Sequence, residues 1–286
     1  MQPYEYQKIK KDNHVIHIVE IDPAAYNIQI ARANDGSGRE SIPALAQRVK
    51  ADIAINGGFF EIGGITDGNP SNTLVIDGKI YALKDEIQSL LIVDKGTLSI
   101  KRNNPKNIKL NGVSILSGIP ILISNGEIPA DLKDKKTDFF VKEHARTAIG
   151  LKPNGNIILM IVEQTYSRDL SEVILGEVYS LINLNKQAYK QKYNKDPSDL
   201  TLREVTEIIE QKYSTPDGSK GVTILALASL MKELGCIRAI NLDGGGSSTL
   251  WMNGAVMNKT VGDEDESKGE SVIRKVSDAI TFTKIK

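Results

Sequence analysis

The stretch Ala239-Ile240-Asn241-Leu242-Asp243-Gly244-Gly245-Gly246-Ser247-Ser248 sets the expectations for the whole chain. It begins as a short apolar strand and ends in an acid, three glycines and two hydroxyls. Three consecutive glycines cost conformational entropy on folding, so they indicate a tight turn or a backbone that approaches a ligand closely. Free N–H groups in such a loop can bind an anion, and the strand would deliver the Asp243 carboxylate beside it. A simple glycine-rich turn between two strands is the alternative interpretation.

A second stretch, Ala54-Ile55-Asn56-Gly57-Gly58, repeats the order of strand, asparagine and glycines. Residues 41–60 and 222–248 each predict a helix, then a buried strand, then a glycine loop, with Ser41 suited to cap the first helix. We therefore predict a duplicated helix–strand–glycine-loop unit whose two loops meet at one site. Chance similarity between two short buried strands is the alternative.

The rest of the chain is rich in strand and hairpin signals. Turns at Asp77-Gly78, Lys95-Gly96 and Asn253-Gly254 separate short apolar runs, a pattern typical of hairpins. Residues 166–220 differ, because charge rises, helical spacing appears, and Thr201-Leu202-Arg203-Glu204 forms a capping-box pattern. We predict one α+β domain over residues 1–286, with a mixed β-sheet core, flanking helices and a helical insertion at about 166–220.

Composition excludes several classes of protein. The 286 residues carry a formal net charge of +0 and a pI of about 6.9, whereas nucleic-acid-binding domains usually carry a basic excess. The single Cys236 excludes an intramolecular disulfide framework. No apolar run approaches the length of a membrane span. The polar start of the chain, Met1 to Tyr4, shows no signal-peptide core.

Six further pieces together resemble the phosphodiester glycosidase family, and they occur in the family's order. They are Asn56-Gly57-Gly58-Phe59-Phe60, Ser117-Gly118-Ile119-Pro120, His144-Ala145-Arg146-Thr147-Ala148-Ile149-Gly150, Val162-Glu163-Gln164-Thr165, Gly221-Val222-Thr223 and Asn241 to Ser248. Each piece alone is weak, and the Asn-Leu-Asp-Gly-Gly-Gly-Ser stretch is the most specific. The resemblance implies hydrolysis of a sugar 1-phosphodiester, which releases free sugar and leaves a phosphomonoester, in a secreted or periplasmic protein.

Two carboxylates, Glu163 and Asp243, are the candidate catalytic pair. Cleavage at a sugar carbon passes through an oxocarbenium-like state and commonly uses two such groups. Because a phosphomonoester is already a good leaving group, the essential carboxylate is expected to act as base or nucleophile; which of the two does so stays open. His144 is a candidate proton donor, with a packing or surface role as the alternative.

Arg146 is the candidate phosphate clamp, because a guanidinium binds phosphate through two parallel hydrogen bonds; a buried structural pair is the alternative. Arg274 could add positive charge, although a surface ion pair is favoured. Phe59 and Phe60 could wall the site, with one of them in the core. The remaining candidates for substrate and phosphate binding are Asn56, Gly57, Thr147, Asn241, Gly244, Gly245, Gly246 and Ser247.

No cofactor is required by this chemistry. Asp243, with Asp67 and loop carbonyls, would offer oxygen ligands to Ca²⁺ or Mg²⁺, but the spacing matches no EF-hand. The predicted partner is a small-molecule or glycan phosphodiester, and the oligomeric state stays open. Two alternatives to the glycosidase are a metal-dependent phosphodiesterase that cuts the P–O bond and a non-catalytic module that binds carbohydrate phosphates.

Overall fold

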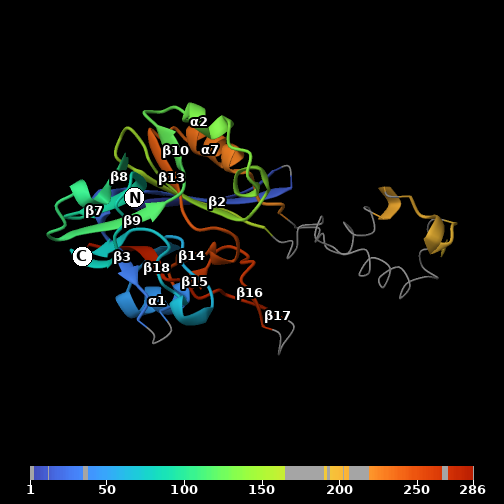
Figure 1. Cartoon of the computed structure of the whole chain (residues 1–286), viewed down its shortest axis with the longest axis horizontal. Coiled ribbons are helices and arrows are strands. Elements are labelled where there is room, and N and C mark those ends of the chain that lie inside the picture. The colour runs from blue at the N-terminus through green and yellow to red at the C-terminus, as the bar shows by residue number, and fades with distance from the viewer. Residues whose placement is uncertain are drawn as a thin grey trace.

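A computed structural model describes residues 3–11, 13–34, 38–164, 190–191, 194–201, 203–205, 219–265 and 270–285. The described strands form three sheets of five or six strands and one small two-stranded ribbon (Figure 1). The three larger sheets enclose a common apolar core, and helices cover the outer faces of two of them.

The first sheet has the strand order β1-β2-β12-β11-β13-β10. Its strands are β1 (Tyr4–Lys11), β2 (His14–Ile21), β10 (Ile121–Ser124), β11 (Arg146–Leu151), β12 (Ile157–Val162) and β13 (Arg238–Asn241). Strand β13 pairs with β11 on one side and with β10 on the other, so the strand that precedes the three glycines lies inside the sheet.

The second sheet has the order β15-β14-β4-β18-β3 and receives the chain after those glycines. Its strands are β3 (Tyr26–Arg32), β4 (Ile53–Asn56), β14 (Leu250–Met252), β15 (Ala255–Val256) and β18 (Asp278–Lys284). The loop between β13 and β14 therefore crosses from the first sheet to the second.

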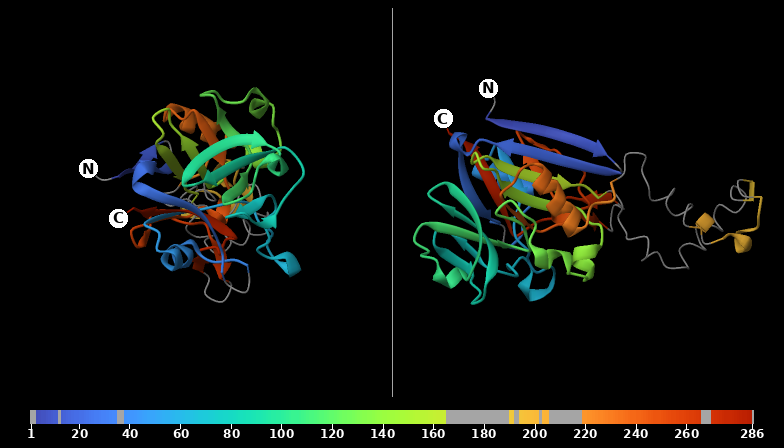
Figure 2. Two further views of the ribbon diagram at one scale, coloured as in Figure 1. Left: turned by 90° about the vertical axis from the view of Figure 1, so that its left-hand side faces the viewer. Right: turned by 90° about the horizontal axis from the view of Figure 1, so that it is seen from above.

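The third sheet, β6-β5-β9-β7-β8, is made of hairpins (Figure 2). Its strands are β5 (Leu74–Ile76), β6 (Lys79–Ala82), β7 (Gln88–Asp94), β8 (Thr97–Asn103) and β9 (Val113–Gly118). The turns at Asp77-Gly78 and Lys95-Gly96 use positive φ angles, as the predicted hairpins require. The ribbon pairs β16 (Asp263–Asp265) with β17 (Glu270–Val272).

Four α-helices are described: α1 (Ile42–Val49), α2 (Ala130–Lys133), α3 (Asp138–Val141) and α7 (Ile224–Glu233). The two longer ones begin as predicted. Ser41 Oγ accepts from the Ala44 N–H in α1, and Thr223 Oγ1 accepts from the Ala226 N–H in α7. Short 3₁₀ turns occupy Pro23–Ala25, Gly64–Thr66, Pro105–Asn107, Pro197–Asp199 and Gly245–Ser247.

The core follows the alternation of side chains along the strands. The inner faces of all three sheets contribute to one cluster, for example Ile149, Ile55 and Leu91. On the outer face of the first sheet, α7 packs against strands β10, β11 and β13, and its Leu227 and Met231 belong to the apolar cluster of that face. The outer face of the second sheet packs against α1. Residues of opposite parity on one strand of the first sheet thus face either the shared core or the α7 layer.

Both helix–strand–glycine-loop units are present, and the antiparallel sheets with few helices are compatible with the predicted α+β class, but the mixed sheet is wrong. Every pairing between the described strands of these sheets is antiparallel, because hairpins and crossing loops replace parallel crossovers. Most of the predicted insertion lies outside the described residues. Within its described part, Glu204 accepts from the Thr201 N–H at 2.7 Å and Thr201 Oγ1 accepts from the Glu204 N–H, so the capping box forms. Among the described residues, no helix is long and apolar enough to cross a membrane.

Candidate active site

The two glycine loops meet at the end of the shared core, as the sequence predicts. The Asp243 N–H donates to the Gly57 carbonyl at 3.0 Å. In return, Asn56 Nδ2 donates to the Asp243 carbonyl at 2.7 Å. Asn56 is fully buried, and its Oδ1 accepts from Thr147 Oγ1 at 2.9 Å and from the Thr249 N–H at 3.2 Å. One amide therefore ties β4, β11 and the β13–β14 loop together.

Each of the three glycines has its own structural reason. A Cβ at Gly244 would lie 2.7 Å from the Ala145 carbonyl oxygen, and a Cβ at Gly246 would lie 2.5 Å from Arg274 Cζ. Gly245 has open space around it but a φ of +56°, which is the left-handed region that favours glycine. The run of glycines thus allows close packing on both sides of one left-handed residue.

The loop is not an open nest of free N–H groups. The Gly244 N–H donates to Asp243 Oδ1 at 2.9 Å, and the Gly245 N–H donates to the Ala145 carbonyl at 2.8 Å. The N–H groups of Ser247 and Ser248 donate to carbonyls within the loop itself. These four bonds argue against the expected backbone anion site, because the donors already have partners.

Asp243 is the carboxylate that this loop positions. Its surroundings raise its pKa to about 6, chiefly because the group is removed from water, and the carboxylate of Asp278 adds to the rise. Ser247, the Gly244 N–H and the positive charge of Arg274 act in the opposite direction. A carboxyl group with a pKa near 6 exchanges its proton close to neutral pH, which suits acid–base chemistry.

Asp278, at the start of β18, belongs to the same cluster and was not predicted. It is 2% exposed, and its Oδ1 accepts from the Gly58 N–H at 2.8 Å. The Asp278 carbonyl also accepts from the Gly57 N–H at 3.0 Å. Burial raises the pKa of Asp278 to about 6, although the Gly58 N–H, Ser277 and Arg32 oppose the rise. In sequence, Asp278 looks like an ordinary polar residue before an apolar strand, so no signal singled it out.

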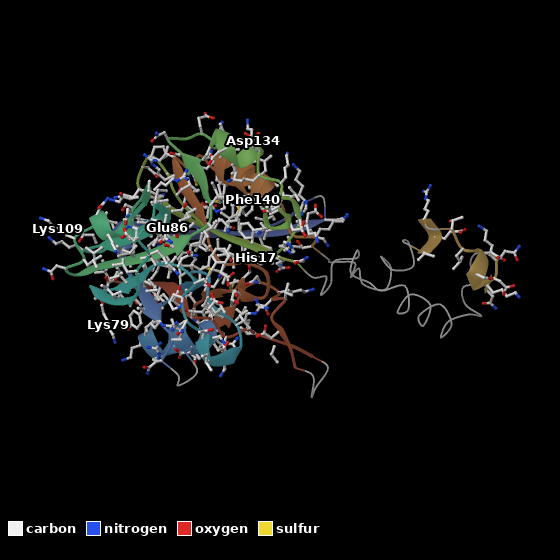
Figure 3. All side chains as sticks on the ribbon, in the orientation of Figure 1. His17, Lys79, Glu86, Lys109, Asp134 and Phe140 are labelled. Atoms are coloured by element: carbon white, nitrogen blue, oxygen red, sulfur yellow. The ribbon has the colours of Figure 1, made fainter. Side chains whose placement is uncertain are left out.

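Glu163 follows β12 and is 1% exposed. Its Oε1 accepts from His17 Nε2 at 2.7 Å and from the Lys259 N–H at 2.7 Å. The hydroxyl of Tyr6 is hydrogen-bonded to His17 Nδ1 at 2.8 Å, and His17 itself is fully buried near the middle of the molecule (Figure 3). Burial raises the pKa of Glu163, but these hydrogen bonds and the charge of His17 outweigh it and hold the pKa below its usual range.

A chain of hydrogen bonds links Glu163 to the Asp243 loop. Lys259 follows Asn258, whose side chain donates to the Ser248 carbonyl at 2.9 Å and accepts from the Leu250 N–H at 2.8 Å. Ser248 Oγ lies 3.1 Å from Thr147 Oγ1, which reaches Asn56. These contacts, together with the peptide link between Asn258 and Lys259, connect Glu163 to the backbone of Asp243. The pKa of Glu163 is lowered and that of Asp243 is raised.

Arg146 does not join this network through its side chain. Arg146 and Thr147 are neighbours on β11, so their side chains point to opposite faces of the first sheet. The Arg146 side chain lies on the face that α7 covers. Its Nε donates to the Val222 carbonyl at 3.0 Å, and its Nη2 donates to the carbonyls of Phe139 and Lys142 at 2.7 and 3.1 Å. It is 3% exposed, and burial lowers its pKa to about 10. This arrangement favours a buried structural role over the predicted phosphate clamp.

Arg274 lies against the glycine loop that follows Asp243. Its Nε donates to Asp263 Oδ1 at 2.6 Å, so the predicted ion pair exists. The same guanidinium packs against Gly246 and lowers the pKa of Asp243, so its positive charge reaches the loop. Its side chain is 22% exposed and keeps contact with water.

Asn241 and His144 lie near the site in different ways. Asn241 Nδ2 donates to the Ile119 carbonyl at 2.5 Å, while its buried Oδ1 has no hydrogen-bond partner among the described atoms. Its side chain has the parity of the α7 face. His144 precedes β11, is half-buried and forms a backbone bridge to Val222. The Asn241 side chain donates to Ile119 and not to Glu163 or Asp243.

The predicted aromatic wall and metal ligands also have definite positions. Phe60 is in the core beside α1, and Phe59 packs edge-to-face on Phe139 with ring centroids 5.9 Å apart. Asp67 pairs with Arg39 at 2.9 Å and lies apart from the Asp243 network. In the described part of the chain, no three His, Cys, Asp or Glu side chains are grouped as a metal site would need.

Solved structures share this fold. The catalytic domain of zebrafish N-acetylglucosamine-1-phosphodiester alpha-N-acetylglucosaminidase, auto-inhibited by its pro-peptide, matches with a TM-score of 0.66 and 19% identity, over 99% of this chain and 82% of that one. A protein of Burkholderia pseudomallei matches with a TM-score of 0.62 and 15% identity, over 94% of this chain and 74% of that one. A Synechocystis protein matches with a TM-score of 0.57 and 13% identity, over 98% and 62%.

These likenesses show that the chain shares its fold with these proteins. The sequence profile of the phosphodiester glycosidase family matches residues 49–187 and 203–283. The chain belongs to the phosphodiester glycosidase family. An uncharacterised protein of Rickettsia conorii is 24% identical, and the match covers 58% of this chain and 92% of that protein. Family and fold support a hydrolase of this kind.

Proposed function

We propose that the protein hydrolyses a sugar 1-phosphodiester between the sugar carbon and the phosphate oxygen. The products are free sugar and a phosphomonoester. The observation that carries this proposal is the pair of carboxylates Glu163 and Asp243, whose residues are connected by hydrogen bonds through the β13–β14 loop. Glu163 has a lowered pKa and Asp243 has a pKa raised to about 6. Two carboxyl groups whose environments separate their pKa values are typical of glycoside hydrolysis.

The roles follow from these ionisation states. Above about pH 6, Asp243 is ionised and can act as base or nucleophile toward the sugar carbon. Glu163 stays ionised, and its negative charge stabilises the oxocarbenium-like state that develops as the glycosidic bond breaks. The phosphomonoester leaves readily, so a strong proton donor is not required. For the phosphate we favour Arg274 over Arg146, since the donors of Arg146 already serve three carbonyls.

A turnover screen over sugar 1-phosphodiesters that differ in the sugar tests the reaction directly. Each assay is run in ¹⁸O-labelled water, and the products are analysed by mass spectrometry. Attack at the sugar carbon places the label in the free sugar, as the proposal expects. Label in the phosphate would show P–O cleavage and overturn the proposed reaction. Tight binding without turnover across the panel would instead indicate a binding module.

A further inference from the structure

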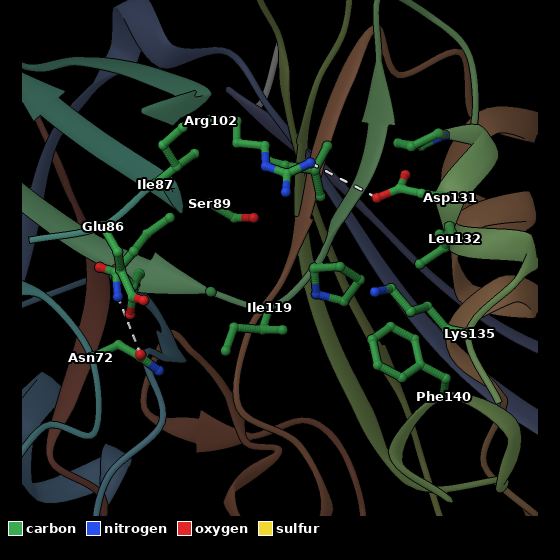
Figure 4. A pocket seen from close by; sticks show the side chains of 16 residues that line it. Asn72, Glu86, Ile87, Ser89, Arg102, Ile119, Asp131, Leu132, Lys135 and Phe140 are labelled. Atoms are coloured by element: carbon green, nitrogen blue, oxygen red, sulfur yellow. Dashed lines mark hydrogen bonds and ion pairs between the residues drawn. The ribbon is translucent and has the colours of Figure 1, made fainter. Parts of the chain in front are cut away.

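A pocket of about 310 Å³ opens between the third sheet and the α2–α3 segment (Figure 4). We name it the β9–α2 pocket. Gln88 and Ser89 of β7 line one side, Lys135 and Phe140 line the other, and Ile119 lies between them. Its volume is at the lower end of the range for small-molecule sites, which suits a ligand of one or two rings.

One side of the pocket is a fixed polar chain. Ser117 Oγ donates to Gln88 Oε1 at 2.8 Å, and Gln88 Nε2 donates to Asn72 Oδ1 at 3.3 Å. Ser117 and Gln88 are 2% and 8% exposed, so the chain is held by its surroundings. Pre-oriented amide and hydroxyl groups of this kind recognise the hydroxyl groups of a ligand without rearrangement.

The remaining walls combine exposed apolar side chains with equal numbers of positively and negatively charged side chains. Ile87 is 68% exposed and Ile119 is 41% exposed, and both line the pocket. Phe140 packs edge-to-face on Phe139, with ring centroids 5.1 Å apart. The charged residues of the lining are two cations and two anions, namely Arg102, Lys135, Glu86 and Asp131. A balanced rim around apolar and amide surface favours a neutral, amphipathic ligand over an anion.

The pocket is joined to the candidate active site through Asn241. The Ile119 N–H donates to the Asn241 carbonyl at 2.9 Å, and Asn241 Nδ2 donates back to the Ile119 carbonyl at 2.5 Å. A Cβ at Gly118 would lie 2.2 Å from the Asn241 carbonyl oxygen, so the two segments are in direct contact. Asn241 precedes Asp243 by two residues. A ligand in the pocket would therefore sit next to the strand that carries the candidate catalytic carboxylate.

We propose that the β9–α2 pocket binds a neutral pyranose unit, which the Ser117–Gln88–Asn72 chain and the apolar faces of Ile87, Ile119 and Phe140 recognise. A pyranose presents hydroxyl groups at its edge and C–H groups on its faces, and the pocket offers partners for both. This inference rests on the proposed function, since it gives the sugar of the substrate, or a sugar beyond it, a place to bind. The pocket would then determine which glycosyl group is accepted.

Direct binding of methyl glycosides tests this without turnover. Methyl α-glycosides of glucose, mannose, galactose and N-acetylglucosamine are titrated into the whole chain and followed by NMR. Ser89→Tyr, which fills the pocket, should weaken the best binder by at least about tenfold, because shape complementarity is lost. Ser99→Tyr is the matched control, since Ser99 is a partly buried residue of the same sheet that does not line the pocket. It should change affinity less than about twofold.

A milder pair of variants keeps the test valid if Ser89→Tyr fails to fold. Ile87→Ala removes an exposed apolar wall and should weaken binding about threefold or more, whereas Ile80→Ala, 51% exposed on the same sheet, should not. Affinity should also be nearly independent of salt for a neutral ligand. Absence of binding by all four glycosides, or binding that both pocket variants leave unchanged, would overturn the proposal. Glycoside binding without phosphodiester turnover would overturn the proposed function alone.

Discussion

Asn56 Nδ2 donates to the Asp243 carbonyl at 2.7 Å, and this bond joins the ends of two strands that belong to different sheets. Asn56 also accepts from the Thr147 hydroxyl and the Thr249 N–H, so one buried amide satisfies three groups. Strands β4 and β13 both end in Ala-Ile-Asn, and this repeat predicted that the two glycine loops meet. Their contact makes Asn56 a structural centre of the site.

Asn56→Ala should therefore destabilise the protein strongly. It removes the Asn56 partner of the Thr249 N–H and of the Asp243 carbonyl, and one of the two partners of the Thr147 hydroxyl. Each unsatisfied group costs ~1–3 kcal/mol, so the free energy of unfolding should fall by about 2 kcal/mol or more. Urea denaturation measures the change. Asn156→Ala is the control, because Asn156 is partly exposed and its side chain makes one bond to Glu20. Equal losses in both variants would refute the central role of Asn56.

Asp243→Asn should lower turnover by about a hundredfold or more, the scale of acid–base contributions. The fold should persist, because Asn keeps an oxygen that accepts from the Gly244 N–H. Asp67→Asn changes a loop carboxylate that pairs with Arg39 away from the network, and it should keep near-full activity. The measurement is kcat on the best substrate of the screen. A loss of activity in Asp67→Asn would bring that residue back as a ligand or catalytic group.

Asp278→Asn should shift the pH dependence of the enzyme. Removing the Asp278 charge lowers the pKa of Asp243, since that charge is one cause of its rise. The acid limb of kcat/KM, expected near pH 6 in the wild type, should therefore move to lower pH. Activity is measured between pH 4 and 8. An acid limb that stays in place would show that Asp278 does not influence the group that titrates in catalysis.

The same two carboxylates predict how stability depends on pH. Both have folded-state pKa values of about 6, above the value of ~3.9 expected in an unfolded chain. Between about pH 4 and 6 the folded state holds more protons than the unfolded state, so stability falls as pH rises through this range. In Asp278→Asn that fall should be smaller by ~1–2 kcal/mol, as measured by denaturation at pH 4 and pH 7. An unchanged fall would contradict the raised pKa of Asp278.

Variants of the hydrogen-bonded series Tyr6–His17–Glu163 should distinguish a residue that acts in the reaction from one that only supports the structure. Glu163→Gln should lower turnover by about a hundredfold, because the negative charge near the sugar is lost. Tyr6→Phe removes only the outer hydrogen bond, which contributes ~1 kcal/mol to stability, and it should leave turnover within about threefold. Thermal unfolding and kcat are measured for both variants. If Tyr6→Phe lowers turnover as much as Glu163→Gln, the hydrogen bond between Tyr6 and His17 takes part in the reaction.

The two arginines should respond oppositely to replacement by lysine. Arg146→Lys cannot reach three carbonyls and should lower the free energy of unfolding by about 2 kcal/mol or more, with little effect on inhibition by inorganic phosphate. Arg274→Lys keeps the charge but loses the fork, so it should weaken phosphate inhibition and change stability by less than about 1 kcal/mol. Weaker phosphate inhibition in Arg146→Lys alone would restore the sequence-based assignment.

Local features of this fold were predictable because their causes are local. The caps at Ser41 and Thr223 and the turn at Asp77-Gly78 depend on residues that are neighbours in the chain. The meeting of the two glycine loops was predictable from the repeated Ala-Ile-Asn pattern. The sheet type was not, because antiparallel pairing between β11 and β13 joins residues far apart in sequence.

The differences between the site predicted from sequence and the arrangement in the structure have a similar origin. Arg146 lies in a motif and looks like a ligand-binding residue, but its partners are backbone carbonyls, which leave no mark in the sequence. Asp278 looks unremarkable at a strand start, and only the fold brings it against Gly57 and Gly58. Arg274 was expected to form an ion pair and does. Its contact with Gly246 arises only in the folded chain, because the two residues are far apart in sequence.

The loop that crosses from β13 to β14 also restricts which sequence changes the site can accept during evolution. The loop enters from one sheet and leaves into another, and its glycines fit against Ala145 and Arg274. An insertion beside Gly244 or Gly246 would disturb these close contacts, so we expect the length of this loop to be restricted. New specificities would instead have to arise at the margins, through substitutions around the loop that leave its length untouched. The reaction and the crossing of the loop between the two sheets would then be inherited together, while substitutions around the loop change which substrates are accepted.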